Sequence, residues 1–179
     1  MSRALLITNP VAARTQELTW HRVAQTLERA GWQTEIAVTL APGHARELAA
    51  QGVTAGVDAV AVFGGDGTTM QAAAALVGTE VALGLIPGGT GNLLAGNLRI
   101  PSDPLRAVRL LFQGRRRKID LGRVVLPDGE HYFGVAAGCG IDARIMGETA
   151  SADKRRWGSA PTWRPRSACC PSCGAPRAW

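Results

Sequence analysis

The segment Gly64–Thr68, with the sequence GGDGT, carries residue types that suit phosphate and metal binding. It follows an apolar run at residues 57–63 and precedes a helix-like stretch that ends at Leu76. Glycines let a backbone approach an anion closely, and the free N–H groups of the next helix's first turn point at that anion. A carboxylate repels a phosphate unless a cation lies between them, so Asp66 indicates Mg²⁺. The alternative is a tight turn that Asp66 merely caps.

A second glycine turn lies in the segment Pro87–Asn92, with the sequence PGGTGN. It follows the apolar run 81–86 and precedes a helix-like stretch at 93–98, so the two strand–turn–helix units lie about 24 residues apart. This spacing predicts two turns at the carboxyl ends of neighbouring parallel strands, where open α/β sheets bind ligands. Neither turn contains a GxGxxG fingerprint or the GK[ST] of a P-loop.

Together the two turns resemble the catalytic domain of diacylglycerol kinases and related lipid kinases, such as sphingosine and ceramide kinases. Three further segments agree in type and order. Residues 5–10 resemble the family's opening strand and its Asn-Pro turn, residues 118–122 its strand with an interior aspartate, and residues 133–143 the strand that leaves its first domain. The resemblance covers residues 4–158. NAD kinases and phosphofructokinases use turns similar to GGDGT, but PGGTGN and KIDLG favour the lipid kinases.

The resemblance implies a nucleotide-binding domain at residues 1–158, of the type that forms the N-terminal domain of NAD kinases and diacylglycerol kinases. It implies ATP and Mg²⁺ as cofactors and a lipid such as diacylglycerol as the partner. The expected reaction transfers the γ-phosphoryl group of ATP to a lipid hydroxyl, as in phospholipid biosynthesis. The alternatives are an NAD-kinase-like enzyme and a non-catalytic nucleotide-binding remnant. The family's catalytic base lies in a second, β-rich, lipid-binding domain that we expect to be absent here, so no catalytic residue is assigned.

The candidate site residues follow from the motifs and from the resemblance. The nucleotide-binding candidates are Asn9, Pro10, Thr39, Gly64, Gly65, Asp66, Gly67, Thr68, Thr90, Gly91 and Asn92. Asp66 and Asp120 are the candidates for Mg²⁺, directly or through water, because Mg²⁺ usually takes one or two carboxylates together with substrate phosphates. Alternatives remain at several positions. Asn9 and the threonines of the glycine turns equally suit helix caps, and Thr39 equally suits an ordinary strand.

The elements that position these residues alternate between strand and helix. Strands are expected at residues 4–8, 34–40, 59–63 and 81–86, and helices at 17–30, 42–51, 68–76, 93–98 and 103–112. Gly31 and Gly52 are expected to end the first two helices. A hairpin is expected from strands at 117–125 and 131–137. This alternation favours an α/β fold with an open, mainly parallel sheet and helices on both faces.

Charge and hydropathy limit the partners. The net charge is +6, but residues 151–179 hold six Lys or Arg and one Asp, so most of the excess lies there and a nucleic-acid partner is disfavoured. No apolar run reaches the ~18 residues of a membrane span, and the first residues lack a leader's apolar core. We therefore expect a cytoplasmic protein. The basic run Arg115–Lys118 is either a solvated loop or a contact with phosphates or anionic lipid, which allows peripheral contact with the inner membrane face. The sequence does not indicate an oligomeric state.

The tail at residues 159–179 differs in composition from the rest. From Pro161 onward it contains no Leu, Ile, Val, Met or Phe, so it cannot continue a packed core. Cys170 and Cys173 form a CxxC pair, but a structural zinc site usually needs four ligands and a second CxxC pair is missing. In a shifted reading frame, codons for Trp, Cys and Ser become codons for apolar residues at helical spacing. We therefore expect an out-of-frame tail on a chain truncated after its N-terminal domain.

Overall fold

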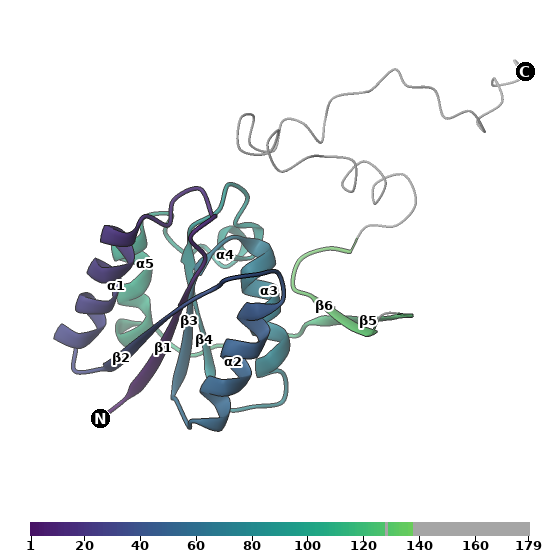
Figure 1. Cartoon of the computed structure of the whole chain (residues 1–179), viewed down its shortest axis with the longest axis horizontal. Helices are drawn as coiled ribbons and strands as arrows, with labels where there is room; N and C mark the ends of the chain where they lie inside the picture. Colours follow the sequence, from purple (N-terminus) through teal and green to yellow (C-terminus); the bar gives the residue numbers. More distant parts are fainter. Residues whose placement is uncertain (128, 138–179) are drawn as a thin grey trace, which may run out of the picture. The chain divides into compact units, whose positions relative to one another are not determined.

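The computed structural model describes residues 1–127 and 129–137. These residues belong to one compact unit, Met1–Ala137, which Figure 1 draws in colour. The expectations for residues 138–158 and for the tail at 159–179 lie outside the described residues and stay predictions.

Four parallel strands form the central sheet. They are β1 (Arg3–Thr8), β2 (Gln33–Val38), β3 (Ala59–Gly64) and β4 (Ala82–Pro87), in the order β2-β1-β3-β4. Every residue of β3 is buried, because it lies between two other strands and under helices on both faces. Its near-continuous apolar sequence is typical of a strand in such a sheet. The expected parallel sheet is confirmed.

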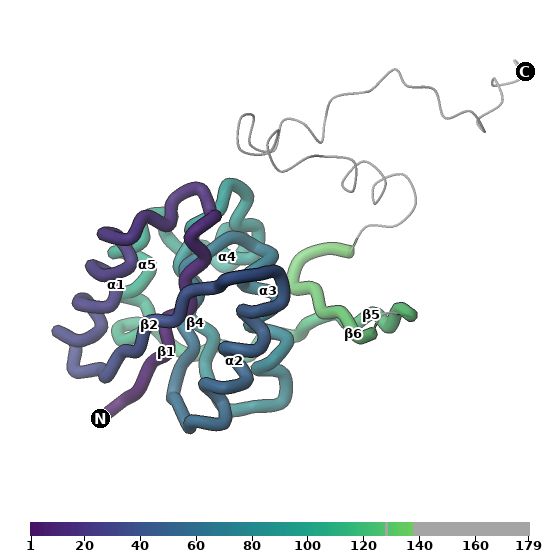
Figure 2. The backbone as a smooth tube through the Cα atoms, viewed as in Figure 1, coloured from purple at the N-terminus to yellow at the C-terminus, as the bar shows by residue number. Residues whose placement is uncertain are grey.

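Helices cover both faces of this sheet (Figures 1 and 2). They are α1 (Glu17–Arg29), α2 (His44–Thr54), α3 (Asp66–Leu76), the short α4 (Leu93–Asn97) and α5 (Pro104–Gln113). Leu6 and Phe63 point to one face and pack against α1 and α5. Ile7 and Val62 point to the other face and pack against α2 and α3. This two-sided core confirms the expected α/β fold, and the parallel pairing of the strands places their carboxyl ends at one edge.

Two glycines predicted to stop helices behave differently. Gly31 has φ +86°, and its N–H donates to the carbonyl of Glu28 while the N–H of Trp32 donates to that of Leu27. This Schellman arrangement ends α1 as expected. Gly52 lies inside α2, so the predicted stop there is wrong. A Cβ at Gly52 would lie 2.9 Å from Leu5 Cδ2, so this glycine lets the helix pack closely on the sheet.

The expected hairpin is present as β5 (Gly122–Leu126) and β6 (Gly129–Phe133), paired antiparallel. Its first strand starts later than predicted, because residues 115–121 have no regular secondary structure. Asp120 therefore precedes the strand instead of lying within it. Gly122 pairs with Phe133, and a Cβ at Gly122 would lie 2.1 Å from Phe133 Cζ. The aromatic ring thus fills the space at the first pair of the hairpin. The second strand also ends earlier than predicted, at Phe133 instead of residue 137.

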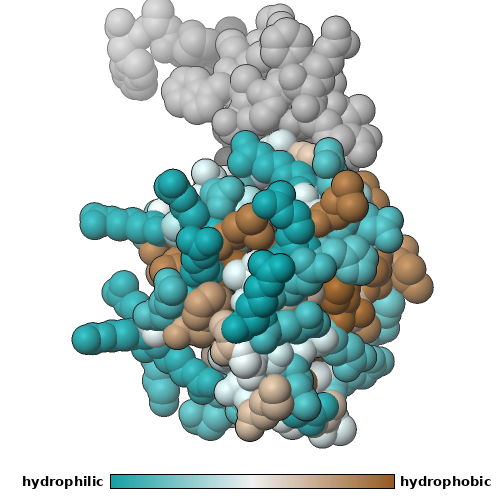
Figure 3. All heavy atoms as spheres, turned by 90° about the vertical axis from the view of Figure 1, so that its left-hand side faces the viewer, coloured by the Kyte–Doolittle hydropathy of each residue, from teal (hydrophilic) through white to brown (hydrophobic). Residues whose placement is uncertain are grey.

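The surface seen from the side of α1 is mainly hydrophilic, with apolar patches between the polar side chains (Figure 3). Among the described helices, none combines the length and the apolar character that crossing a membrane requires.

Candidate functional site

The strand order places a topological switch point between β1 and β3. From β1 the chain moves to β2 on one side, and it returns to place β3 on the other side. The connections that leave β1 and β3 therefore diverge, and ligands of open α/β sheets bind in the crevice at the carboxyl ends of such strands. Asn9 follows β1 and the segment Gly64–Thr68 follows β3, so both lie at this crevice.

The first glycine turn leads directly into α3. Gly65 is the N-cap of the helix, and Asp66 is its first residue, two positions earlier than predicted. The N–H of Thr69 donates to the carbonyl of Gly65 at 3.0 Å, whereas the earlier N–H groups of the first turn have no carbonyl four residues back within the helix. Gly65, as the N-cap, has no side chain that could cap this N-terminus. The start of α3 therefore offers N–H groups and the positive end of an 11-residue helix to an anion.

The second glycine turn lies directly against the first. The N–H of Gly88 donates to the carbonyl of Gly64 at 2.8 Å. A Cβ at Gly89 would lie 2.7 Å from Gly65 Cα, which is closer than real Cβ atoms approach. The two backbones thus touch at positions where a side chain has no room. The glycines of both motifs therefore make one composite loop surface.

Asn92 holds the second turn closed. It has φ 51° and ψ 46°, a left-handed conformation that Asn tolerates better than most residues. Its Oδ1 accepts from the N–H of Gly89 at 2.9 Å, and its Nδ2 donates to the carbonyl of the same residue at 2.7 Å. The structure thus gives Asn92 a role in shaping the turn. Thr90 and Gly91 lie exposed at its tip.

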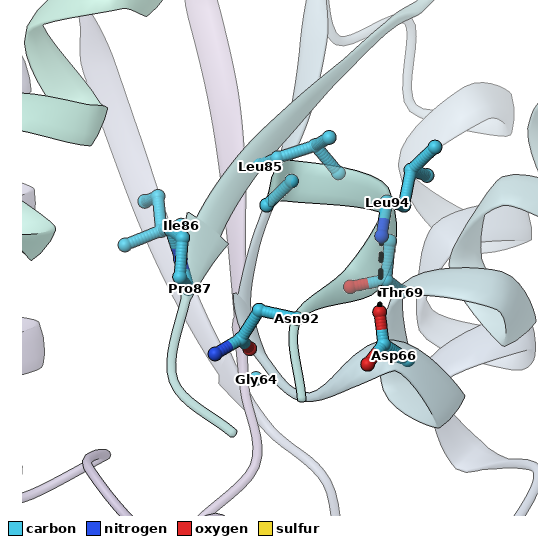
Figure 4. A pocket seen from close by; sticks show the side chains of 9 residues that line it. Gly64, Asp66, Thr69, Leu85, Ile86, Pro87, Asn92 and Leu94 are labelled. Atoms are coloured by element: carbon cyan, nitrogen blue, oxygen red, sulfur yellow. Dashed lines mark hydrogen bonds between the residues drawn. The ribbon is translucent and has the colours of Figure 1, made fainter. Parts of the chain in front are cut away.

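Asp66 connects the two turns (Figure 4). Its Oδ1 accepts from the N–H of Leu94, in the first turn of α4, at 3.3 Å. A Cβ at Gly91 would lie 2.9 Å from Asp66 Oδ2. The carboxylate therefore caps a different helix from its own, across a pocket that both turns line. The alternative that Asp66 caps a helix is correct, but the helix that it caps is α4 and not its own helix, α3.

A magnesium ion fits this arrangement in part. Asp66 has a second carboxylate oxygen for which the described residues offer no hydrogen-bond donor, and Mg²⁺ is commonly held by one carboxylate, substrate phosphates and water. Within residues 1–127 and 129–137, no three His, Cys, Asp or Glu side chains form a group that could hold a metal by themselves. Asp120 is exposed in the irregular segment before β5. A pairing of Asp66 with Asp120 stays a prediction.

The loop after β1 joins the same surface. Asn9 Nδ2 donates to Thr68 Oγ1 at 2.9 Å, and Asn9 Oδ1 accepts from the N–H of Val11 at 3.0 Å. Pro10 is exposed. Thr39 is buried, and its N–H donates to the carbonyl of Thr8 at 2.9 Å, which places it at the carboxyl end of β2. Together with the second turn after β4, the structure thus brings the candidates that follow four parallel strands to one edge.

Sequence reasoning missed the residues that join the β1 loop to the second turn. The N–H of Arg14 donates to the carbonyl of Gly88 at 2.9 Å. Thr15 is 5% exposed, and its hydroxyl donates to the carbonyl of Asn9. A Cβ at Gly88 would lie 2.7 Å from Thr15 Cγ2, so Thr15 fills the space that this glycine leaves. No local pattern marks the contact of either residue with the second turn, because Gly88 lies more than 70 residues away in the chain.

Comparison with known proteins agrees with this geometry. The family model described as the diacylglycerol kinase catalytic domain matches residues 3–124. The chain belongs to this family. The matched range includes both glycine turns, Asn9 and Asp120.

Individual proteins that resemble this chain are also named as diacylglycerol kinases or lipid kinases. A diacylglycerol kinase of Mycobacterium tuberculosis is 40% identical over 115 residues, which are 63% of this chain and 36% of the relative. A probable lipid kinase YegS-like protein of Pectobacterium atrosepticum is 33% identical over 160 residues, which are 87% of this chain and 52% of the relative. The crystal structure of a putative diacylglycerol kinase from Bacillus anthracis matches with a TM-score of 0.60 at 28% identity, over 67% of this chain and 45% of that one. The chain thus spans between a third and about half of the length of these relatives.

Proposed function

We propose that this chain forms the nucleotide-binding part of an ATP-dependent lipid kinase. The intact enzyme would transfer the γ-phosphoryl group of ATP to the hydroxyl of a lipid such as diacylglycerol, a step of phospholipid metabolism. The observation that carries this proposal is the direct contact of the two glycine turns beside the uncapped start of α3. Such a surface suits a polyphosphate better than a single small anion, because the N–H groups at the start of α3 lie beside a second glycine backbone where no side chain blocks a larger ligand.

In this proposal, different residues would bind the phosphates, the metal ion and the rest of the nucleotide. The first-turn N–H groups of α3 and the glycine backbones would bind phosphate oxygens, and charge on these oxygens increases as phosphoryl transfer proceeds. Asp66 would hold Mg²⁺ against the phosphates through its free carboxylate oxygen, and the ion would supply charge neutralisation when bound. Thr39 and Pro10, at the ends of β2 and β1, would border the rest of the nucleotide.

The proposal also includes a lipid acceptor and a location at a membrane surface. A kinase with a lipid acceptor must meet a membrane surface, and cytoplasmic ATP requires that this be the inner face. The basic run Arg115–Lys118 supports such contact, because all four side chains are exposed and the described residues provide them with no ion-pair partner.

The first experiment is a calorimetric titration of the full chain with ATP, with and without Mg²⁺. Saturable binding that Mg²⁺ strengthens supports the proposal, and absence of binding refutes the nucleotide-binding role. Phosphoryl transfer is then assayed with radiolabelled ATP and either diacylglycerol vesicles or NAD as the acceptor. Labelled NAD would favour an NAD-kinase-like enzyme. ATP binding without transfer to either acceptor would favour a non-catalytic nucleotide-binding chain.

A further inference from the structure

Thr68 makes a hydrogen bond that differs from those of Thr26 and Thr54, two other helical threonines among the described residues. Thr26 Oγ1 donates to the carbonyl of Arg22 at 2.7 Å, and Thr54 Oγ1 donates to that of Ala50 at 3.1 Å. Donation to the carbonyl four residues back is the usual pattern in helices. Thr68 lies in the first turn of α3, so the residue four positions back belongs to β3 instead of the helix. Its hydroxyl bonds to Asn9 instead.

The direction of this bond follows from the second bond of Asn9. The N–H of Val11 can only donate, so the side-chain atom 3.0 Å from it must be the carbonyl oxygen Oδ1. The amide nitrogen Nδ2 therefore faces Thr68. This nitrogen has no acceptor capacity, so the Thr68 hydroxyl accepts the bond and keeps its own proton for another partner. None of the described residues accepts that proton.

The position of the hydroxyl is also fixed. Thr68 is 8% exposed, and a Cβ at Gly64 would lie 3.0 Å from Thr68 Cβ. The missing side chain at Gly64 thus gives the threonine its place over the end of β3. Asn9 Nδ2 then holds the hydroxyl oxygen at 2.9 Å. The remaining proton lies on a nearly buried group at the N-terminus of α3, next to N–H groups that also lack helical partners.

We propose that Asn9 is a positioning residue that orients the Thr68 hydroxyl to donate to a phosphate oxygen of the nucleotide. This inference rests on the nucleotide-binding function proposed above. Asn9 acts through Thr68: its amide fills the acceptor side of the hydroxyl, so the proton points to the ligand. A phosphate oxygen is the complementary partner, because it only accepts hydrogen bonds and bears the charge that α3 favours.

A double-mutant cycle on the full chain tests this role. The variants are Asn9→Ala, Thr68→Val and the combination, with Thr68→Ser as the conservative replacement and Thr54→Val as the matched control. Affinities are measured by calorimetry for ATP and for inorganic triphosphate, and by equilibrium dialysis for adenosine. We expect Thr68→Val to weaken ATP and triphosphate binding about 10-fold, the size of one hydrogen bond to a charged group. Asn9→Ala should weaken them similarly, and the double variant should bind no more weakly than Thr68→Val alone. Thr68→Ser, which keeps the hydroxyl, should recover most of the affinity that Thr68→Val loses, whereas Thr54→Val should bind as the unmodified chain does.

The outcomes separate this inference from the proposed function. If the unmodified chain binds neither ATP nor triphosphate, the proposed function fails and the inference fails with it. If it binds both and the two single losses add in the double variant, the positioning role alone is refuted. An equal loss of adenosine binding also refutes it, because a proton aimed at phosphate does not affect a ligand without one. Unfolding curves for all variants show the folded fraction, and a loss that disappears after correction for this fraction marks a merely structural role.

Discussion

Substitution of Gly89 by alanine tests the contact that makes the two glycine turns one surface. The added Cβ would lie 2.7 Å from Gly65 Cα and 3.2 Å from Asn92 Oδ1. The first of these neighbours is backbone at the N-cap of α3, directly after β3, so it cannot move away by a change of rotamer. Relief requires that one turn shift from the other by several tenths of an ångström. Overpacking of this kind costs about 1–3 kcal/mol.

The cost should appear both in stability and in binding. For a unit of this size the midpoint of thermal unfolding falls by roughly 2–8 °C per kcal/mol, so a loss of about 2 kcal/mol should lower it by about 4–16 °C. ATP affinity should fall further than stability explains, because a shift between the turns moves the second turn away from the N–H groups at the start of α3. Calorimetric scans and ATP titrations of the full chain measure the two effects.

Gly96→Ala is the matched control for this variant. Gly96 lies in α4, and a Cβ there would meet no atom within 4 Å. Because alanine favours helix over glycine by about 1 kcal/mol, this control should be neutral or slightly stabilising and should keep its ATP affinity. If Gly89→Ala unfolds and binds ATP as Gly96→Ala does, the contact between the turns is not what shapes the site.

Three further substitutions test separate parts of the site and core. Asp66→Asn should keep the bond from the Leu94 N–H but remove the charge, so ATP affinity with Mg²⁺ should fall about 10-fold while affinity without Mg²⁺ stays equal or rises, measured by paired titrations. Gly91→Ala would place a Cβ 2.9 Å from Asp66 Oδ2, so it should weaken only the Mg²⁺-dependent part of ATP binding, and an equal loss in EDTA would contradict this. Phe63→Ala should cost about 3–5 kcal/mol in urea unfolding, because the ring is fully buried between the sheet, α1 and α5; a loss below 1 kcal/mol would refute that packing.

The order of strands and helices was predictable because each signal is local. Apolar runs marked the buried strands. Gly31 ended its helix because its left-handed conformation, with φ +86°, lets the last carbonyls of the helix bond to N–H groups of the residues next to it in the chain. Gly52 shows the limit of this reasoning. The same residue type lies inside a helix there because packing against Leu5 outweighs the local preference for a stop. The late start of β5 has a similar origin, since Phe133 across the hairpin sets the first pair.

The candidate site was predictable as a set of residues but not as a set of contacts. Its motifs indicated phosphate binding at two turns, and the parallel sheet brought both turns to one edge. The contact of Gly65 with Gly89 depends on the spacing of β3 and β4 at their carboxyl ends, which no sequence pattern encodes. The bond from Asn9 to Thr68 joins residues 59 positions apart. Such partners become visible only once the strand order is known.

Asp66 shows how the structure reconciles two alternatives that the sequence left open. A capping aspartate and a metal-binding aspartate would compete if each needed the whole carboxylate. Here Oδ1 takes the N–H of Leu94, while Oδ2 faces Gly91, the one residue type that leaves this oxygen uncovered. The cap fixes the rotamer of the side chain, and a fixed rotamer lowers the entropy lost when the second oxygen binds an ion. Capping of α4 therefore prepares Asp66 for a cation, and the two roles support each other.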